Sequence, residues 1–468
     1  MKSRVPSPVF AVGVTCAVLA CLALAGCGGA TSDRPSSGTA QATSGAIPAT
    51  LPARRAPQPG KGSKDPDDVN GDGYRDLLLP AGVVFGSAHG LDPAVRSVWS
   101  RAETGDPDLA NGVTEPLPVA ADLDGDGFPD FVSVRRGPTV QEKGSFPVAR
   151  AVPNVSWGGP TGPTPGAEPT ALRMPDRVTK LGMSQLVRGD FDGDGHHDLA
   201  GSAANKSSLV VLYGPFSRSG APARTETRLP WSGGSLFADA IDPSGKPRAT
   251  SLLVHGTNDN EQSGNTLVVA HRGTGLAARG TALRRGNAHA FGDFDGDGVR
   301  DVAVGDDRSR NDEDAPGTEP PDVDGSLTVH PGSGAPPVVH RLPDVPKGLG
   351  TDYGPGGFTA ADPDGDGRDG ILVATYQGAT LIDGDRRTTV LRRGPATVGG
   401  KRTPAKWLHA RPVGAGDFDG DGRDELVLAW APGLQFGLYG EHPSYWWITD
   451  GTGSRDRASF VTDAFASG

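Results

Sequence analysis

The stretch that decides the fold is "GDFDGDGVRDVAVGD", residues 292–306, where four aspartates fall within nine positions and an apolar run follows. Alternating aspartates with glycines are typical of a tight loop, and the apolar run 302–305 is typical of a buried β-strand. Nearly the same text recurs along the 468 residues. The fold therefore depends on how these loop-and-strand units assemble.

Six copies of the acidic loop are clear, and they begin at Asp68, Asp122, Asp190, Asp293, Asp362 and Asp417. The gap between the third and fourth copies is about twice a typical spacing, and "DAIDPSGK" from Asp239, followed by "SLLV", supplies a degraded copy inside it. Seven units of roughly 50 to 70 residues, each containing several short strands, predict an all-β protein with a seven-bladed β-propeller.

Each unit reads as four strands, A to D. In the unit at Asp293, "HAFG" is expected to form strand A, "DVAVG" strand B and "SLTVHPGS" strand C. Only polar sequence precedes Asp68, so the first unit lacks a strand A, whereas "ASFVTDAF", residues 458–465, resembles a strand A with no blade after it. We therefore expect the C-terminal strand to pair into the first blade and close the ring, which removes exposed sheet edges.

The acidic loops have the residue pattern of a cation site. Oxygen-bearing side chains stand at positions 1, 3, 5 and usually 9, glycine stands at 6, and position 7 offers its carbonyl, a set of hard oxygen ligands that suits Ca²⁺. The predicted ligands are Asp68, Asn70, Asp72, Tyr74, Asp76, Asp122, Asp124, Asp126, Phe128, Asp130, Asp190, Asp192, Asp194, His196, Asp198, Asp293, Asp295, Asp297, Val299, Asp301, Asp362, Asp364, Asp366, Arg368, Asp417, Asp419, Asp421, Arg423 and Glu425.

Three loops depart from this pattern. Gly370 occupies position 9 of the copy at Asp362, the loop of the sixth unit, which leaves open whether Asp369 substitutes for it, and Glu425 replaces aspartate in the last copy. The copy at Asp239 has lost its ligands, so we predict no metal there. About six structural Ca²⁺ ions would nearly cancel the formal net charge of -11.

Two other kinds of loop share parts of this pattern. Isolated "DG" pairs are common in hairpin turns, but six copies with oxygen ligands at positions 1, 3 and 5 favour metal. An EF-hand or dockerin loop needs an acidic residue at position 12 and flanking helices. Position 12 here holds Leu79, Ser133, Gly201, Val304, Val373 and Leu428, inside β-patterned runs.

The motifs "DFDGDGVRDVAVGD" followed by "GSLTVHPGS", and "DVNGDGYRDLLLP" followed by "VVFGS", resemble FG-GAP or VCBS repeats, the blade type of integrin α-chains. The resemblance covers residues 65–468. It implies Ca²⁺ in the loop between strands A and B, and a role in adhesion or recognition of a protein or glycan.

The N-terminal sequence has the pattern of a targeting signal. Lys2 and Arg4 precede the apolar stretch 9–26, in the order of a secretory signal. "LAGC", residues 24–27, resembles the lipobox of bacterial lipoproteins, which implies a lipid on Cys27; the alternative is a retained helix. We therefore divide the chain into a signal peptide (1–27), a disordered linker (28–64) and the propeller (65–468), and expect a secreted protein that is lipid-anchored on the outer face of the bacterial cytoplasmic membrane.

Composition limits the partners. The sequence pI of about 5.4 and the absence of a basic stripe argue against nucleic acid. All three cysteines lie within the first 27 residues, so the propeller has no disulfide. We expect a monomer whose only membrane contact is the lipid anchor.

Long insertions between strands B and C, residues 135–154 and 306–324, are expected on the face opposite the acidic loops. They either hold a ligand or are merely tolerated. The aromatic residues Tyr439, Tyr445, Trp446 and Trp447 would pack between blades or stack on a sugar.

The sequence contains no G-x-S-x-G, H-E-x-x-H, P-loop or dinucleotide-binding motif. The favoured function is a surface protein that binds a protein or glycan. The alternatives are a polysaccharide lyase or hydrolase using insertion residues such as Lys143 or Arg150, and a purely structural envelope protein.

Overall fold

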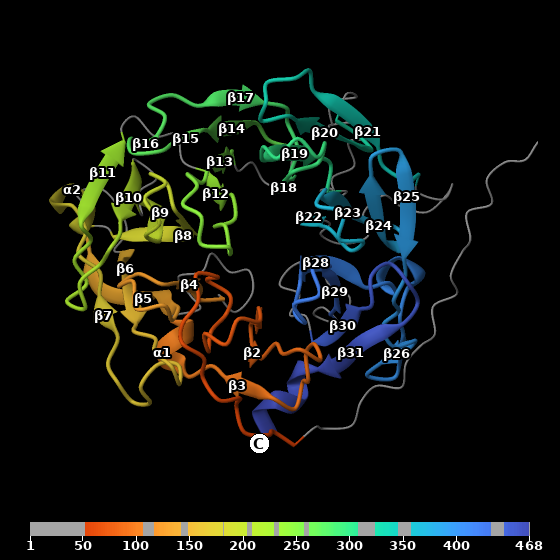
Figure 1. Ribbon diagram of the computed structural model, residues 1–468, viewed down its shortest axis with the longest axis horizontal. Coiled ribbons are helices and arrows are strands. Elements are labelled where there is room, and N and C mark those ends of the chain that lie inside the picture. Colours follow the sequence, from red (N-terminus) through yellow and green to blue (C-terminus); the bar gives the residue numbers. More distant parts are fainter. Residues whose placement is uncertain are drawn as a thin grey trace, which may run out of the picture. The chain divides into compact units, whose positions relative to one another are not determined.

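Antiparallel sheets follow one another along the chain and stand as seven blades in a ring (Figure 1). The computed structural model describes residues 52–105, 117–141, 148–180, 182–203, 208–228, 234–256, 262–307, 323–344, 357–431 and 444–467. Residues 40–468 form one unit. The fold is therefore all-β and a seven-bladed propeller, as the repeats predict.

The blades are numbered here in chain order. Blade 1 contains β1 (Leu77–Leu79), β2 (Gly82–Val84) and β3 (Arg96–Val98), and blade 2 contains β4 (Val119–Ala121), β5 (Asp130–Val140), β6 (Val148–Ser156) and β7 (Thr170–Ala171). Blade 3 contains β8 (Met183–Gly189), β9 (Asp198–Ala203), β10 (Leu209–Tyr213) and β11 (Arg224–Arg228). Blade 4 contains β12 (Ser235–Ala238), β13 (Leu252–His255), β14 (Asn265–Val268) and β17 (Thr281–Leu283).

Blade 5 contains β18 (Ala288–Gly292), β19 (Asp301–Gly305), β20 (Ser326–His330) and β21 (Val338–Arg341). Blade 6 contains β22 (Phe358–Ala361), β23 (Gly370–Thr375), β24 (Gly378–Asp383) and β25 (Arg386–Val390), and blade 7 contains β28 (Arg411–Gly416), β29 (Glu425–Trp430), β30 (Tyr445–Thr449) and β31 (Asp456–Val461). The remaining short elements are α1 (Arg101–Thr104), α2 (Asp176–Thr179), β15 (Ala270–His271), β16 (Gly275–Leu276), β26 (Thr397–Val398), β27 (Lys401–Arg402) and the 3-10 turns η2 (Ala405–Trp407) and η3 (Thr462–Ser467).

Side-chain packing closes the ring at every seam between blades. A separate hydrophobic cluster fills each of the seven seams, including the seam between blades 7 and 1. At that last seam Leu79 and Val84 pack with Val427, Ile448 and Phe460. Burial of apolar strand residues between neighbouring sheets therefore stabilises the ring without a disulfide among the described residues.

The predicted route of ring closure is wrong. β31 pairs with β30 in blade 7, with Trp446 opposite Phe460, and does not join blade 1, which has three strands in the described residues. Pairing across the short connection 450–455 costs less chain entropy than pairing with a distant blade. The C-terminal segment reaches blade 1 through side chains instead, because the Arg96 guanidinium lies 4.3 Å from the centre of the Phe465 ring.

The structure also differs from the predicted linker boundary at residue 64. Arg54 forms a bridge with Val95 and an ion pair of 3.0 Å with Asp92. The Gly60 N–H donates a 2.9 Å hydrogen bond to the Asn70 carbonyl. Contacts with the propeller therefore begin before residue 65.

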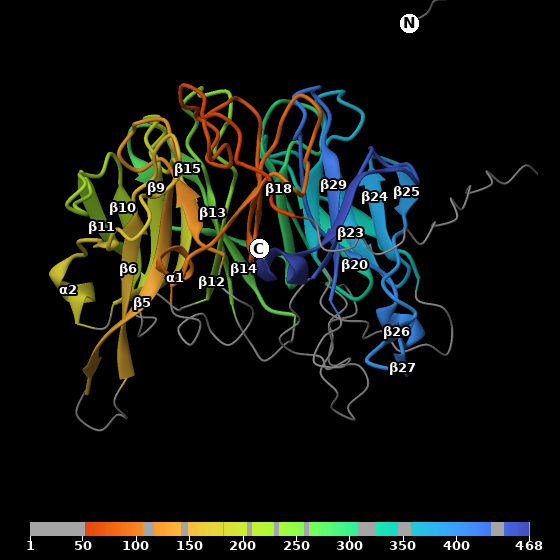
Figure 2. The same ribbon diagram turned by 90° about the horizontal axis from the view of Figure 1, so that it is seen from below.

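The two faces of the ring differ. The A–B loops and C–D turns lie at one face, and at the other, where strands B end and strands C begin, the β5–β6 hairpin extends away from the ring (Figure 2). The described residues of the first predicted insertion, 135–141 and 148–154, thus lie in this hairpin, and most of the second insertion lies outside the described residues. Trp446 and Trp447 are buried in seam clusters, which confirms the packing interpretation for them, while Tyr439 lies outside the described residues.

The predicted signal peptide and Cys27 also lie outside the described residues. Within the described part of the chain, no helix has the length and apolar character needed to cross a membrane.

Candidate metal sites

In the blades with four described strands the acidic loops join strands A and B, as predicted, and the third loop shows how they are built. β8 ends at Gly189 and β9 begins at Asp198. Between them the carboxylate of Asp190 accepts hydrogen bonds of 3.0 Å from the N–H groups of Asp194 and Gly195. The Asp194 carboxylate in turn accepts a 2.9 Å hydrogen bond from the His196 N–H. These local bonds wrap the backbone around the carboxylates, as Asp-rich turns do.

Five loops bring three carboxylates together, with one oxygen from each lying within 4.8 Å of the others. These groups are Asp122, Asp124 and Asp130; Asp190, Asp192 and Asp194; Asp293, Asp295 and Asp297; Asp362, Asp364 and Asp366; and Asp417, Asp419 and Glu425. Several of the predicted ligand carboxylates therefore meet, and each group could hold a metal ion.

The first loop is different because Asn70 stands at position 3. Its amide nitrogen donates a 2.9 Å hydrogen bond to the Asp72 carboxylate. The Asp68 carboxylate accepts a 2.8 Å hydrogen bond from the Gly73 N–H. The loop has the same turn as the others, with an amide in place of one carboxylate.

Position 9 holds the loop to the rest of its blade. In the third loop Asp198 accepts hydrogen bonds from the Phe191 N–H at 2.7 Å and the Gly214 N–H at 2.8 Å. Asp76, Asp130 and Asp301 make the same pair of contacts in their loops. This carboxylate therefore connects the A–B loop to the end of strand C in addition to any metal contact.

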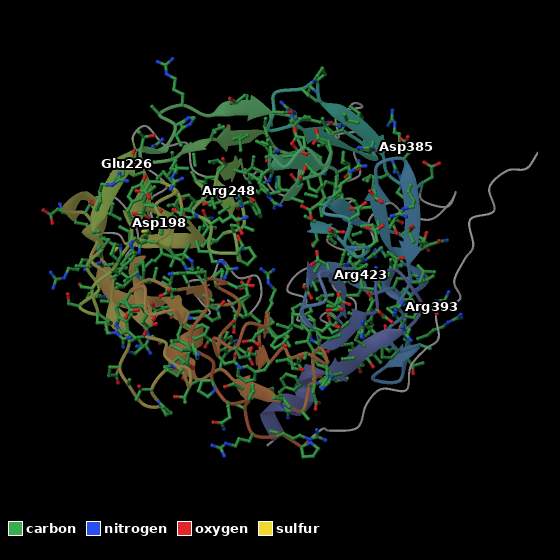
Figure 3. All side chains as sticks on the ribbon, in the orientation of Figure 1. Asp198, Glu226, Arg248, Asp385, Arg393 and Arg423 are labelled. Atoms are coloured by element: carbon green, nitrogen blue, oxygen red, sulfur yellow. The ribbon has the colours of Figure 1, made fainter. Side chains whose placement is uncertain are left out.

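Position 7 carries unrelated side chains, as expected if only its backbone matters. In all six loops its N–H donates to the carboxylate at position 5, from Tyr74, Phe128, His196, Val299, Arg368 and Arg423. Arg423 itself lies toward the central opening in Figure 3. The carbonyl at position 7 remains a predicted ligand.

The electrostatics of the loops suit a bound cation. Burial, together with neighbouring carboxylates, raises the pKa of Asp190 to about 6 and that of Asp198 to about 8. One oxygen of Asp192 is buried with no hydrogen-bond partner, although the other oxygen lies 2.7 Å from Arg224. A buried carboxylate oxygen without a donor is costly, and a cation bound between these side chains would satisfy it.

The degraded fourth loop has protein cations at its carboxylate. Arg248 forms an ion pair with Asp239, and Arg300 from blade 5 lies 3.1 Å from the other oxygen of Asp239. Arg248 lies on the inner side of blade 4, toward the central opening (Figure 3). Two guanidinium groups thus neutralise this carboxylate, in keeping with the predicted loss of a metal site.

Sequence reasoning missed a contact that joins neighbouring loops across the seams. The N–H of Asp362 donates a 2.9 Å hydrogen bond to the Asp424 carboxylate. The Asp424 N–H donates a second hydrogen bond of 2.9 Å back to the Asp362 carbonyl. Asp369 makes the same two-way contact with Asp293. Equivalent acceptors at two further seams are the side chains of His197 and Thr250.

This contact answers the question left open for the sixth loop. Asp369 stands beside Gly370, but one of its oxygens lies 2.8 Å from the Asp293 nitrogen and 3.0 Å from Arg300. The Asp369 carboxylate therefore contacts the neighbouring blade 5. It does not replace the missing position-9 ligand of its own loop.

Comparisons with known proteins support no argument about this chain. No family model and no curated protein matches the chain. Three solved structures resemble it weakly: "BBS1N in complex with ARL6DN" (11% identity, 80% of this chain and 91% of that one, TM-score 0.36), the Photorhabdus luminescens Tc holotoxin pore (13%, 80% and 17%, 0.33) and the Vibrio cholerae biofilm matrix protein Bap1 (14%, 89% and 83%, 0.26). At these TM-scores, none of the three supports an argument about function.

Proposed function

We propose that this chain is a lipid-anchored bacterial surface protein whose FG-GAP/VCBS-type propeller is stabilised by Ca²⁺ and binds a protein or glycan. The observation that carries the proposal is a set of five clusters of three carboxylates, repeated at one face of a closed ring. In each cluster, one oxygen from every carboxylate lies within 4.8 Å of the others. Hard oxygen ligands and glycine-rich turns favour Ca²⁺ over softer metals.

Calcium would act as a structural ion. The proposed ligands at positions 1, 3 and 5 lie in the loops that make the two-way contacts between blades, so an ion would stiffen both a loop and its seam. Extracellular calcium modules bind at about 10⁻⁴ to 10⁻³ M. Sites with such affinities would keep their calcium ions bound when the protein works outside the cell.

The ligand would bind on the face opposite the acidic loops. There the β5–β6 hairpin projects from the ring, and the second long insertion follows β19. Loops carried on a rigid scaffold are common sites of recognition. The fold is consistent with a binding role, and this arrangement leaves the metal loops free to hold the scaffold.

The binding proposal can be tested by shortening the hairpin. Arg136 is paired with Ala151, so residues 137–150 can be replaced by a two-residue Asn-Gly turn without changing the remaining register. The chain from Gly28 onward and this variant would be compared on arrays of glycans and of extracellular proteins. We expect the hits of the parent to be lost in the variant, while its calcium content and melting temperature stay the same. Equal binding by both chains would contradict a site on the hairpin.

The anchor is tested separately. In the native host, Cys27→Ala should move the protein from the membrane fraction to the medium, and mass spectrometry of the parent should find acyl chains on Cys27. An unmodified cysteine in a membrane-bound chain would contradict the lipid anchor.

A further inference from the structure

Within the part of the chain that the structure describes, the seam between blades 4 and 5 has the smallest cluster of buried apolar side chains. Among the described residues its cluster has three buried side chains, Leu253, Val302 and Val304, whereas five of the other seams have ten or more. A cavity of about 580 Å³ lies in this seam. Its volume is within the range of small-molecule sites in proteins, roughly 300 to 1,000 Å³.

The walls of the cavity are mainly apolar. Leu267, Val269 and Leu283 line it from blade 4, and Val302 and Pro337 line it from blade 5. Val269 keeps 38% of its surface exposed, so part of this wall is open to solvent. An apolar molecule that entered here would cover surface that the fold leaves uncovered, which favours binding.

The charged residues of the cavity are already neutralised. Arg248 donates to the Asp239 carboxylate and to the Ala240 carbonyl. Arg300 donates to Asp239, to Asp369 at 3.0 Å and to the Phe291 carbonyl at 3.0 Å. With two guanidinium groups set against two carboxylates, this end of the cavity does not call for a charged ligand.

His330, at the end of β20, supplies the remaining polar feature. It lines the cavity, and its Nε2 is buried without a hydrogen-bond partner among the described residues. Burial lowers the pKa of this imidazole, so the ring is neutral at pH 7. A buried ring nitrogen without a partner is unfavourable by about 1–3 kcal/mol, which a ligand hydroxyl or amine would relieve.

We propose that the cavity between blades 4 and 5 binds a small uncharged amphipathic molecule. Its apolar body packs between Val269 and Val302, and its single hydroxyl or amine group hydrogen-bonds to Nε2 of His330. The wall chemistry and the neutralised charges carry this inference. It is separate from the proposed macromolecular ligand and does not depend on it.

The test uses N-phenyl-1-naphthylamine, an uncharged aromatic amine whose fluorescence rises in apolar surroundings. The chain from Gly28 onward keeps the whole closed ring, and it would be titrated in about 1 mM calcium without detergent. We expect a saturable increase that corresponds to one site per chain. No saturable increase would overturn the proposal.

Two pairs of variants locate the site. Val269→Trp should abolish the increase because the indole fills the cavity, whereas Val98→Trp, at a valine that is 50% exposed on β3 of blade 1, should leave it unchanged. His330→Leu should weaken binding about three- to tenfold, and His330→Gln should restore it because the amide can still form a hydrogen bond.

Circular dichroism would confirm that each variant folds. If Val269→Trp does not fold, Thr281→Trp, which enters the cavity from β17, replaces it. Binding by the cavity-filling variant equal to that of Val98→Trp would place the probe elsewhere and refute the site. Unchanged binding by His330→Leu would refute the role of His330.

Discussion

Replacing Asp369 by alanine should weaken the seam between blades 5 and 6. The Asp369 carboxylate accepts hydrogen bonds from the Asp293 N–H and from Arg300, and both partners come from blade 5. The substitution removes these two contacts and leaves the backbone of the acidic loop in blade 6 intact. The seam, rather than any one blade, is the structure under test.

The expected loss follows from the burial of the groups involved. An N–H deprived of its acceptor in a largely buried site costs about 1–3 kcal/mol. The ion pair with Arg300, whose side chains are 28% and 19% exposed, adds about 1 kcal/mol. Burial and repulsion from Asp362 and Asp293 raise the pKa of Asp369, and relief of that repulsion offsets part of this loss. We therefore expect a loss of about 2–3 kcal/mol.

Urea unfolding followed by tryptophan fluorescence measures the effect. Asp369→Asn keeps an acceptor oxygen and should lose about 1 kcal/mol, and Asp385→Ala, at the rim of the same blade, should be neutral (Figure 3). Calcium stoichiometry should be unchanged in Asp369→Asn, because this residue faces the neighbouring loop. A neutral Asp369→Ala, or a lost calcium ion in Asp369→Asn, would refute the reasoning.

Three further predictions use matched or paired variants. Gly158→Ala should destabilise the chain by about 1–3 kcal/mol because a Cβ there would lie 2.0 Å from the Pro129 carbonyl oxygen, whereas Gly159→Ala should be neutral in the same urea titration. Asp190→Asn should lower the calcium stoichiometry by one in isothermal titration, and Asp242→Asn in the degraded loop should leave it unchanged; equal counts would contradict the site. Burial lowers the pKa of His289 to about 3 from 6.5, so the unfolded chain binds more protons and stability falls as pH drops from about 6.5 toward 3. His289→Gln should therefore reduce the shift of the urea midpoint between about pH 7 and pH 5, and an identical shift would refute this assignment.

The sequence predicted the repeat and the loops well because both are encoded locally. The expected strands "HAFG", "DVAVG" and "SLTVHPGS" agree closely with β18, β19 and β20. Paired glycines and alternating aspartates dictate the turn, and the apolar runs dictate the buried strands. The degraded copy at Asp239 could also be located, because its strand pattern survives the loss of the acidic residues.

Features that depend on contacts between distant residues could not be predicted. The strand at 456–461 has an apolar pattern that suits either blade 7 or blade 1, and only the short connection to β30 selects its partner. The contacts across the seams use His197, Thr250, Asp369 and Asp424, which share a position but belong to three residue types. A residue-type pattern cannot reveal a role that histidine, threonine and aspartate fill in different blades.

Thermal unfolding in calcium and in EDTA tests the central claim most directly. At ten times its dissociation constant an ion stabilises the folded state by about 1.4 kcal/mol, so six ions supply about 8 kcal/mol. This is comparable to the whole stability of a typical domain, about 5–15 kcal/mol. The account predicts a melting temperature that is many degrees higher in about 10 mM calcium than in EDTA. Coincident unfolding curves would contradict it.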